Sequence, residues 1–508
     1  MIRAAIASTL TDILETPVVL EVPNNPEHGD FATNVAFGLA KILKKGPKQI
    51  AETLAVDLAQ RFEGKISFQA INGFLNLRLS DAYLLECLEQ APKFPSAHEK
   101  ILLEYVSANP TGPLHVGHGR WAILGHSIES LLRFVGTSID SEFYINDAGN
   151  QVELFYESVN AVKKGLPIPE KGYHGSYIHD LALIEGDPLQ RNLELQKQTL
   201  ARLGITFTFW YSEKELHRKG LVSETIQTIT AKGLTYESEG ALWFKSQSLG
   251  DEKDRVLIKA DGQHTYFAAD MAYHWDKLRR GYDRLINIWG ADHHGYVARV
   301  KAGVAALCGE AFLSDKKFKI VIGQLVSLKR GDEPVRMSKR TGEIITIDEV
   351  VDEIGVDATR FFLIQKGADT HVEFDLELAK KKSAENPVYY IQYAHARMCS
   401  VLEKMDGLVQ TQNFASVQLG LEGAERALIL HCIQAYDEIY GAAQALAPHR
   451  VANYAYELAR QFHTFYEQCP IIKASEDIQA KRVYILIQAQ KTLRLCLELL
   501  GISAPEKM

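Results

Sequence analysis

The chain has 508 residues, of which 46% are hydrophobic and 24% are charged, the balance of an ordinary globular protein. This length predicts two to four domains, and the net charge of −8 argues against a protein that coats nucleic acid indiscriminately. Local basic patches are not excluded, because docking depends on where the charges lie. No apolar run approaches 18 residues, so no membrane span is expected.

The six cysteines are scattered, without a CxxC pair or the spacing of metal ligands, which predicts reduced thiols with structural roles. The first fifteen residues, MIRAAIASTLTDILE, lack a long apolar segment and contain Asp12 and Glu15. They therefore do not resemble a secretory signal, and we expect a cytoplasmic protein.

Residues 1–92 are predicted to form a small α+β domain. Residues 31–45 carry apolar side chains at the spacing of a helix, and residues 66–80 alternate like a pair of strands around Gly73. The apolar residues at helical spacing are Val35, Leu39, Ile42 and Leu43. Two prolines within residues 91–100, APKFPSAHEK, indicate a linker to the next domain.

Residues 98–365 alternate apolar strands with helices, which predicts an α/β domain built on a Rossmann-like, doubly wound parallel sheet. The strand candidates are ILLEYVS (101–107), SEFYIN (141–146), RLINIWG (284–290) and KIVIGQLV (319–326). The charged, helix-rich segment from about 150 to 245 is predicted to be inserted between the two halves of this sheet.

No strand is predicted after about residue 370, and residues 370–508 are expected to form an all-α bundle. Ser475 is predicted to cap the last helix and Gly501 to end it. The apolar stripe between them consists of Leu486, Ala489, Leu493, Leu497 and Leu500.

The most informative stretch is SANPTGPLHVGHGRWAILGHS, residues 107–127, which follows a strand candidate and opens a helical pattern. Gly112 and Gly117 have the spacing of a Walker A loop. The next two residues, His118 and Gly119, stand where that loop needs Lys and Ser/Thr, so a Walker A loop is excluded.

Three interpretations of the histidines in this stretch are left. His115, His118 and His126 could supply three zinc ligands, or two of them could simply pack at the start of the helix. In the third interpretation the stretch binds a nucleotide, because a helix that starts at the carboxyl edge of a parallel sheet directs its positive end at anions. Gly117 would then leave room for a purine, and His115 would reach the phosphates.

The motifs favour the third interpretation. HVGH, residues 115–118, resembles the HIGH signature of class I aminoacyl-tRNA synthetases, and RMSKRTG, residues 336–342, resembles their KMSKS loop with Arg336 in place of the first lysine. WGADHHG, residues 289–295, is similar to the Gly-x-Asp strand end at which Asp292 would bind the ribose of ATP. The resemblance implies an ATP site formed by His115, Gly117, His118, Gly290, Asp292, Arg336, Met337, Ser338 and Lys339.

Longer stretches resemble the bacterial-type arginyl-tRNA synthetases in particular, and they span nearly the whole chain from Gly29 onward. They include EYVSANPTGPLHVGHGR, YINDAGNQ, TYFAADMAYH, WGADHHGYVARVKA, ENPVYYIQYAHAR and GISAPEKM. By this resemblance L-arginine is bound by Glu104, Asn109, His118, Tyr266, Asp270 and His294, the last at a position that is often glutamine in the family. Carboxylates suit this ligand, because a guanidinium is a permanently charged fork of donors.

The resemblance implies an arginine–tRNA ligase. The arginine carboxylate would attack the α-phosphorus of ATP and release pyrophosphate, and the arginyl group would then pass to the 3′-terminal adenosine of the tRNA. His115, His118 and Lys339 are expected to be catalytic, with Arg336 as a further cation, because negative charge spreads over the phosphates during displacement. Mg²⁺ is expected on the ATP phosphates, and no structural metal is predicted.

The expected partners are ATP, L-arginine and the tRNA for arginine, bound by a monomer without a membrane. The bundle at residues 370–508 is similar to the family's anticodon-binding domain, and residues 1–92 to the domain that meets the outer corner of tRNA. Bases could stack on Tyr389, Tyr390, Tyr393, His395 and Arg397, although each tyrosine taken singly is better explained by packing between helices.

Two other functions stay open from the sequence alone. One is a synthetase-like protein that binds RNA without catalysis, against which the intact His115, His118, Ser338 and Lys339 argue. The other is a zinc-dependent hydrolase built on the histidines, which metal analysis would distinguish.

Overall fold

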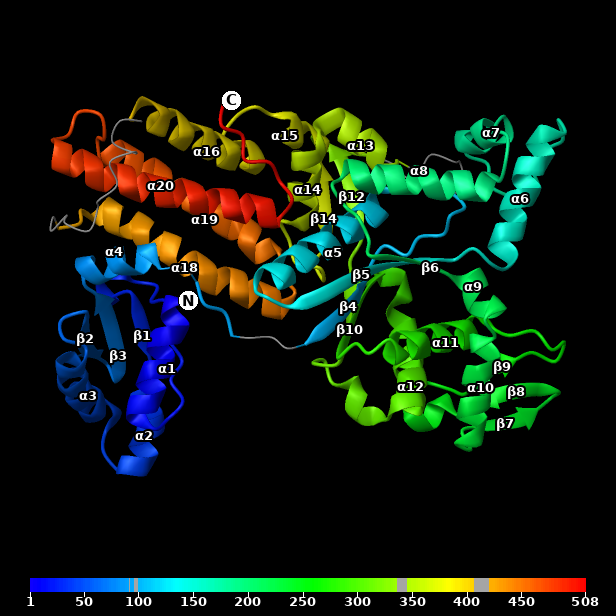
Figure 1. Cartoon of the computed structure of the whole chain (residues 1–508), viewed down its shortest axis with the longest axis horizontal. Coiled ribbons are helices and arrows are strands. Elements are labelled where there is room, and N and C mark those ends of the chain that lie inside the picture. The colour runs from blue at the N-terminus through cyan, green and yellow to red at the C-terminus, as the bar shows by residue number, and fades with distance from the viewer. Residues whose placement is uncertain (91, 96–98, 336–344, 406–419) are drawn as a thin grey trace.

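The computed structural model describes residues 1–90, 92–95, 99–335, 345–405 and 420–508. Its centre is a sheet of five strands in the order β11-β10-β4-β5-β6 (Figure 1). These strands are β4 (Lys100–Glu104), β5 (Ser138–Ile145), β6 (Phe209–Ser212), β10 (Arg284–Gly290) and β11 (Phe318–Gly323). Every neighbouring pair is parallel, so the four strand candidates and the doubly wound sheet are confirmed.

The strand order runs outward from β4 in both directions, which places a crevice at the carboxyl ends of β4 and β10. The helical elements of this part are α5 (Val116–Phe134), α11 (Tyr266–Arg279), α12 (Val297–Cys308), η3 (Ala291–Tyr296) and η4 (Glu310–Leu313). Helix α5 follows β4 and is apolar on most sides, so it is buried nearly along its whole length. Its N-terminus therefore lies at the crevice.

The segment between β5 and α11 is rich in helix, as predicted, but it also contributes to the sheets. It contains α6 (Asn150–Lys163), α7 (Ser176–Ala182), α8 (Pro188–Arg202), α9 (Glu213–Arg218), α10 (Leu221–Ala231), β7 (Thr235–Ser238), β8 (Ala241–Phe244), η2 (Ser246–Leu249) and β9 (Arg255–Ile258). Strand β6 lies inside this segment and pairs with β5 at the edge of the main sheet. Strands β7, β8 and β9 form a separate antiparallel sheet.

A third small sheet follows the main sheet, with the order β13-β12-β14. This part contains β12 (Val326–Arg330), β13 (Glu333–Pro334), α13 (Ile347–Ile354), α14 (Val356–Ile364), β14 (Val372–Asp375) and α15 (Leu376–Lys380). Strand β14 lies after residue 370, so the expectation that no strand follows that residue is wrong. Strand β14 has only four residues, too few to show a period, and it is held by parallel pairing with β12.

The N-terminal residues fold into a small unit that lies apart from the main sheet, beside the helical region (Figure 1). Its elements are α1 (Ile2–Leu14), η1 (Pro26–His28), β1 (Phe31–Thr33), α2 (Val35–Leu43), α3 (Pro47–Arg61), β2 (Ile66–Ile71), β3 (Phe74–Leu79) and α4 (Asp81–Glu89). Strands β2 and β3 pair around Gly73, as predicted. Helix α2 buries Val35 and Leu39, but Ile42 and Leu43 are exposed, because no element covers the end of this helix.

The C-terminal region is a bundle of long helices, as predicted. The helices are α16 (Pro387–Lys404), α18 (Gly423–Ala445), α19 (His449–Gln468) and α20 (Glu476–Leu499). Ser475 occupies the N-cap of α20, and all five residues of the predicted stripe are buried. Gly501 has the positive φ of a helix end, +67°. Within the described residues, every helix is too short or too polar to cross a lipid bilayer.

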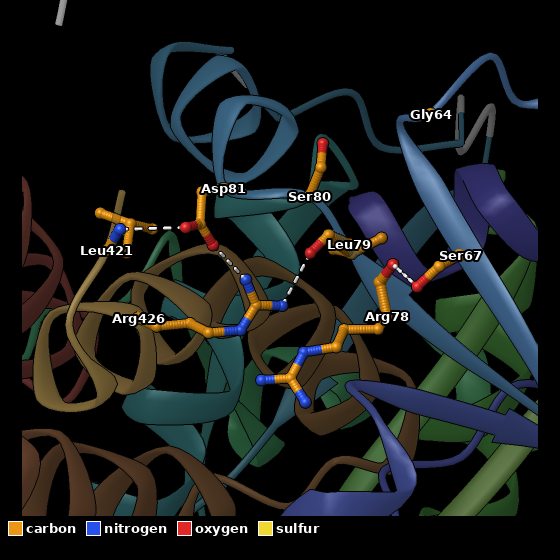
Figure 2. A pocket seen from close by; sticks show the side chains of 8 residues that line it. All are labelled: Gly64, Ser67, Arg78, Leu79, Ser80, Asp81, Leu421 and Arg426. Atoms are coloured by element: carbon orange, nitrogen blue, oxygen red, sulfur yellow. Dashed lines mark hydrogen bonds and ion pairs between the residues drawn. The ribbon is translucent and has the colours of Figure 1, made fainter. Parts of the chain in front are cut away.

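Arg426 of α18 joins the helical region to the N-terminal unit. Its guanidinium donates to Asp30 at 2.6 Å, to Asp81 at 2.7 Å and to the carbonyl oxygen of Leu79 at 2.8 Å. Figure 2 shows the contacts with Asp81 and Leu79, next to the backbone N–H of Leu421, which also donates to Asp81. Because Arg426 is nearly buried, these charged hydrogen bonds hold the two units together.

Candidate functional site at the carboxyl edge of the main sheet

The HVGH turn, residues 115–118, forms the N-terminus of α5. His115 is the N-cap, and its Nδ1 accepts a hydrogen bond from the backbone N–H of His118 at 3.3 Å. In return, the backbone N–H of His115 donates to His118 Nδ1 at 3.4 Å, and the two rings stack with centroids 3.7 Å apart. The two histidines thus act as a capping box that fixes both rings at the positive end of a buried helix.

Glycines are required in this turn because other side chains fill the space. A Cβ on Gly117 would lie 2.9 Å from Cε1 of His115, and one on Gly119 would lie 2.5 Å from Cδ1 of Ile347. Ile347 also donates its backbone N–H to the carbonyl oxygen of Leu114 at 2.9 Å. The chain that follows the second motif therefore packs directly on the first motif.

Four predicted ATP contacts lie in the second motif. Arg336, Met337, Ser338 and Lys339 are outside the described residues. The described residues on the far side of this motif return to the HVGH turn, where Thr346 forms a β-bridge with His115. The described chain after the second motif thus contacts the first motif through Thr346.

Helix α8 holds the loop that leads into the HVGH turn. The amide of Asn192 donates to the carbonyl oxygens of Pro110 at 2.8 Å and Gly112 at 3.1 Å. The amide of Gln196 donates to the carbonyl oxygens of Asn109 at 2.9 Å and Gly112 at 2.7 Å. Both amides are buried, so the loop that carries Asn109 is fixed from the inserted segment. Nothing in the sequence had singled out these two residues.

Glu104 ends β4 as predicted, but it already has a cationic partner. Its carboxylate accepts from Nζ of Lys277 at 2.5 Å and from the hydroxyl of Ser107 at 2.8 Å. Lys277 lies on α11, is fully buried and also donates to the side-chain oxygen of Asn287 at 3.1 Å. A ligand at this strand end would therefore share the carboxylate with Lys277.

Asp270 and Tyr266 lie one turn apart on α11, as their spacing predicts. Asp270 accepts a hydrogen bond from the hydroxyl of Tyr296, and burial raises its pKa to about 6, with the charge of Glu104 adding to this effect. Tyr266 is 55% exposed, and its hydroxyl lies 2.6 Å from the position of a Cβ on Gly149. The start of α11 therefore faces the loop after β5.

A third carboxylate, that of Glu213, interacts with the charge of Asp270, although no sequence pattern indicates it. It is the first residue of α9, directly after β6, and it is buried. Burial raises its pKa to about 7, and the charge of Asp270 adds to this, while a hydrogen bond with Tyr144 acts in the opposite direction. We call Glu104, Glu213 and Asp270 the acidic group. No sequence signal marks Glu213, because β6 is too short to be recognised as a strand.

The predicted residues after β10 lie at the other side of the crevice. Gly290 ends β10, and a Cβ there would lie 2.5 Å from Cη2 of Trp121. Asp292 and His294 follow on η3 and are exposed. The structure therefore places Gly290 beside α5, while the side chains of Asp292 and His294 face the solvent.

The three histidines considered as zinc ligands do not form a ligand set. His115 and His118 engage each other, whereas Nδ1 of His126 accepts from the guanidinium of Arg360 at 3.0 Å. Burial lowers the pKa of His126 to about 3. Within the described ranges no cluster of three or more His, Cys, Asp or Glu side chains could hold a metal ion.

His395 was expected among the side chains on which bases could stack, and the structure corrects this. Its ring is fully buried, with Nδ1 donating to the carbonyl oxygen of Pro505 at 2.9 Å and Nε2 accepting from the amide of Gln490 at 2.7 Å. Tyr393, two residues and about half a turn earlier on α16, is 39% exposed. The helical period places these two residues on different faces, so His395 belongs to the core.

Models of three domain families match separate parts of the chain. The model of the arginyl tRNA synthetase N terminal domain matches residues 1–79, and that of the class I (R) tRNA synthetase catalytic domain matches residues 83–165. The model of the DALR anticodon binding domain matches residues 391–508.

Similarity to individual proteins extends over the whole length. The chain is 42% identical to the arginine–tRNA ligase of Heliobacterium modesticaldum, covering 97% of this chain and 94% of the relative. It is 41% identical to that of Shouchella clausii, covering 100% and 97%. The Thermus thermophilus arginyl-tRNA synthetase has the same fold, with a TM-score of 0.82 over 100% of both chains at 22% identity. The chain belongs to the arginine–tRNA ligases, a family of class I aminoacyl-tRNA synthetases.

Proposed function

We propose that the acidic group binds the guanidinium of arginine, beside an ATP site at the HVGH turn. The carrying observation is that Asp270 lies close enough to Glu104 and Glu213 for their charges to interact, at the carboxyl ends of β4 and β6. Lys277 pairs with Glu104, whereas among the described residues neither Glu213 nor Asp270 forms an ion pair with a lysine or an arginine. A bound guanidinium would supply a positive charge and bidentate donors.

The remaining predicted contacts are proposed around this group. Asn109, His118, Tyr266 and His294 would hold the rest of the arginine molecule, and Gly117, Gly290 and Asp292 the nucleoside. In the proposed reaction the arginine carboxylate attacks the α-phosphorus of ATP, the bond to the bridging oxygen breaks and pyrophosphate leaves with its electron pair. His115, Arg336 and Lys339 would stabilise the charge on the phosphates, with Met337 and Ser338 beside them.

In this proposal Mg²⁺ binds to the phosphates of ATP. The described residues offer no cluster of metal-binding side chains, and Mg²⁺ in such sites is mostly held by phosphate oxygens and water. It would supply positive charge to the phosphates. The side chains of this chain would orient the arginine carboxylate and exclude water from the crevice.

The second proposed step transfers arginine to the 3′-terminal adenosine of its tRNA. The match of residues 391–508 to an anticodon binding domain supports an RNA contact on the helical region. On its surface Tyr389 and Tyr393 stack with centroids 6.3 Å apart, and Arg397 lies 4.3 Å from the ring of Tyr466. We propose the domain bounds 1–92, 98–365 and 370–508, a monomer, and a cytoplasmic location.

Arginine-dependent ATP–pyrophosphate exchange, with and without total tRNA, tests the proposal. We expect exchange with arginine and loss of exchange in His115→Ala and Asp270→Ala. Folded variants that retain wild-type exchange would contradict the proposed site. Absence of exchange with every amino acid in a wild-type protein that still binds tRNA would favour an RNA-binding relative without catalysis.

A further inference from the structure

A buried arginine outside the proposed substrate site joins three distant elements. Arg360 lies on α14 and has no exposed surface. Its Nε donates to the carbonyl oxygen of Leu500 at 2.9 Å, its Nη1 to that of Leu203 at 2.7 Å, and its Nη2 to Nδ1 of His126 at 3.0 Å. These acceptors lie just after α20, just after α8 and in the middle of α5.

The guanidinium of Arg360 is held by neutral acceptors. Among the described residues no carboxylate forms an ion pair with it, and burial lowers its pKa to about 10. His126 can accept because burial keeps its ring neutral, with a pKa of about 3. A buried charge without a counter-ion is costly to a fold, so its three acceptors must be held in place to satisfy it. This energetic cost of burying Arg360 indicates that the residue does more than fill space between helices.

Two of the elements that Arg360 contacts are the supports of the HVGH turn. Helix α8 holds the entering loop through Asn192 and Gln196, whose amides bind three of its carbonyl oxygens. Helix α5 carries the turn itself, and His126 follows His118 by eight residues, about 12 Å along the helix. Arg360 therefore contacts both helices that support the turn.

The third contact comes from the end of the helical region. In Figure 1 the last turn of α20 reaches the place where α14 and α5 meet. Gly501 fits tightly there, because a Cβ would lie 2.4 Å from Nη2 of Arg360 and φ is +67°. The residues that follow stay attached to the same place, since Ser503 donates its backbone N–H to Asp357 at 2.9 Å.

We propose that Arg360 is a positioning residue for the chemical step of arginine activation. It holds α5 and α8 in one geometry against the end of α20, and so sets the position of the HVGH turn relative to the loop that carries Asn109. This inference rests on the proposed role of the turn. A small displacement of reacting groups lowers kcat strongly, whereas the carboxylates of the acidic group, which bind the guanidinium, are not among the contacts of Arg360.

The test is kcat and KM for arginine in pyrophosphate exchange at saturating ATP and tRNA, well below the thermal unfolding temperature. Arg360→Met should lower kcat about tenfold to a hundredfold and change KM for arginine much less, because the guanidinium is held at the acidic group. Arg360→Lys, which keeps the charge and one or two donors, should recover part of the loss. An unchanged kcat in folded Arg360→Met would overturn the inference.

Arg482→Met is the matched control. Arg482 is also a buried arginine, near the start of α20, and contacts Glu422, Glu425 and the carbonyl oxygen of Pro470. We expect it to lower the unfolding temperature without lowering kcat. An equal loss of kcat in this variant would show that any loosening of the bundle slows the enzyme, and would overturn the specific role of Arg360.

If Arg360→Met does not fold, Gly501→Ala provides a second test of the inference. Its added methyl group should displace the guanidinium and lower kcat, and His126→Leu should add no further loss to it, because both act through the same contact. Wild-type kcat in Gly501→Ala, or fully additive losses, would overturn the inference. If the wild type itself shows no arginine-dependent exchange, the proposed function fails, which is a separate result.

Discussion

At the scale of single residues, the carboxylates of the crevice differ in how their charge is compensated. Glu104 pairs with Lys277, whereas Asp270 forms no ion pair with lysine or arginine among the described residues. Glu213 lies 3.6 Å from His217, but burial lowers the pKa of that histidine and weakens its charge. Burial is the main cause of the raised pKa values of Asp270 and Glu213, and the charge of a neighbouring carboxylate adds to each.

Replacing Asp270 with asparagine should reduce kcat/KM for arginine by roughly two to three orders of magnitude, because a cation would lose a carboxylate in a largely desolvated site. Pyrophosphate exchange at varied arginine concentration measures this. Asp276→Asn on the same helix is the control, since Asp276 lies 3.4 Å from Arg280 outside the acidic group. Equal losses in the two variants would speak against the assigned pocket.

Arginine binding should weaken as the pH falls. The pKa of Asp270 is about 6 and that of Glu213 about 7, so both carboxylates take up protons below neutral pH and lose their attraction for a guanidinium. KM for arginine should therefore rise between pH 8 and pH 5.5 while KM for ATP changes less. A KM for arginine that is constant over this range would contradict the pairing.

Deprotonation of Glu213, which favours arginine binding, should lower the stability of the fold. The folded-state pKa of Glu213, about 7, lies above its ordinary value of 4.5, so the folded protein binds this proton more tightly and loses stability as pH rises through 7. Glu213→Gln should therefore raise the midpoint of thermal unfolding at pH 8, by about 1 °C for each kcal/mol in a chain of this length, and less at pH 5. A larger gain at pH 5 than at pH 8 would refute this.

At the scale of elements, helix α5 supports the HVGH turn and is tightly packed against its neighbours. Gly125 faces the buried ring of Tyr105, whose hydroxyl donates to Glu129 at 3.1 Å. Arg120, five residues after His115, is buried and donates to four carbonyl oxygens, those of residues 324, 325, 367 and 370. The helix is therefore attached both to the main sheet and to the segments that flank β12 and β14.

Gly125→Ala should destabilise the protein by about 1–3 kcal/mol, because the new Cβ would lie 2.3 Å from the ring of Tyr105. The midpoint of thermal unfolding measures the change. Gly38→Ala on α2 is the control: nothing lies within 4 Å of its Cβ, and the loss of backbone freedom in the unfolded chain should make it neutral or stabilising. Equal effects of the two variants would contradict the packing argument.

At the scale of the whole molecule, two arginines attach the helical region to the other parts. Arg360, on α14 of the catalytic part, reaches the helical region through the carbonyl oxygen of Leu500, and Arg426 of α18 reaches the N-terminal unit through Asp30 and Asp81. An RNA contact is proposed for the helical region, and the sequence resemblance implies one for residues 1–92, so their relative placement should matter for RNA binding and not for arginine binding.

Arg426→Met should raise KM for tRNA by about tenfold, the effect of losing 1–2 kcal/mol in docking, and leave KM for arginine unchanged. Aminoacylation at varied tRNA concentration measures it. Arg450→Met is the control, because Arg450 pairs with Glu438 inside the helical region, at 2.7 Å. A KM for tRNA that responds equally to both variants would exclude a specific role for the contact between the two units.

The sequence by itself determined the four predicted strands, the two motifs and the family resemblance, because these depend on local pattern. The four apolar runs are long enough to be recognised as strands, and parallel strands end at one edge, which brings residues such as Glu104 and Gly290 to the same crevice. The apolar period of the last helix likewise predicted which of its residues are buried.

Only the tertiary structure decided which distant side chains meet. Lys277 neutralises Glu104 across 173 positions of sequence, and Glu213 joins the acidic group through β6, a strand that exists only by pairing with β5. Ile42 is exposed and His395 buried against the pattern expected for each. Charge pairing, short edge strands and burial depend on neighbours that are remote in sequence, and a local pattern carries no information about them.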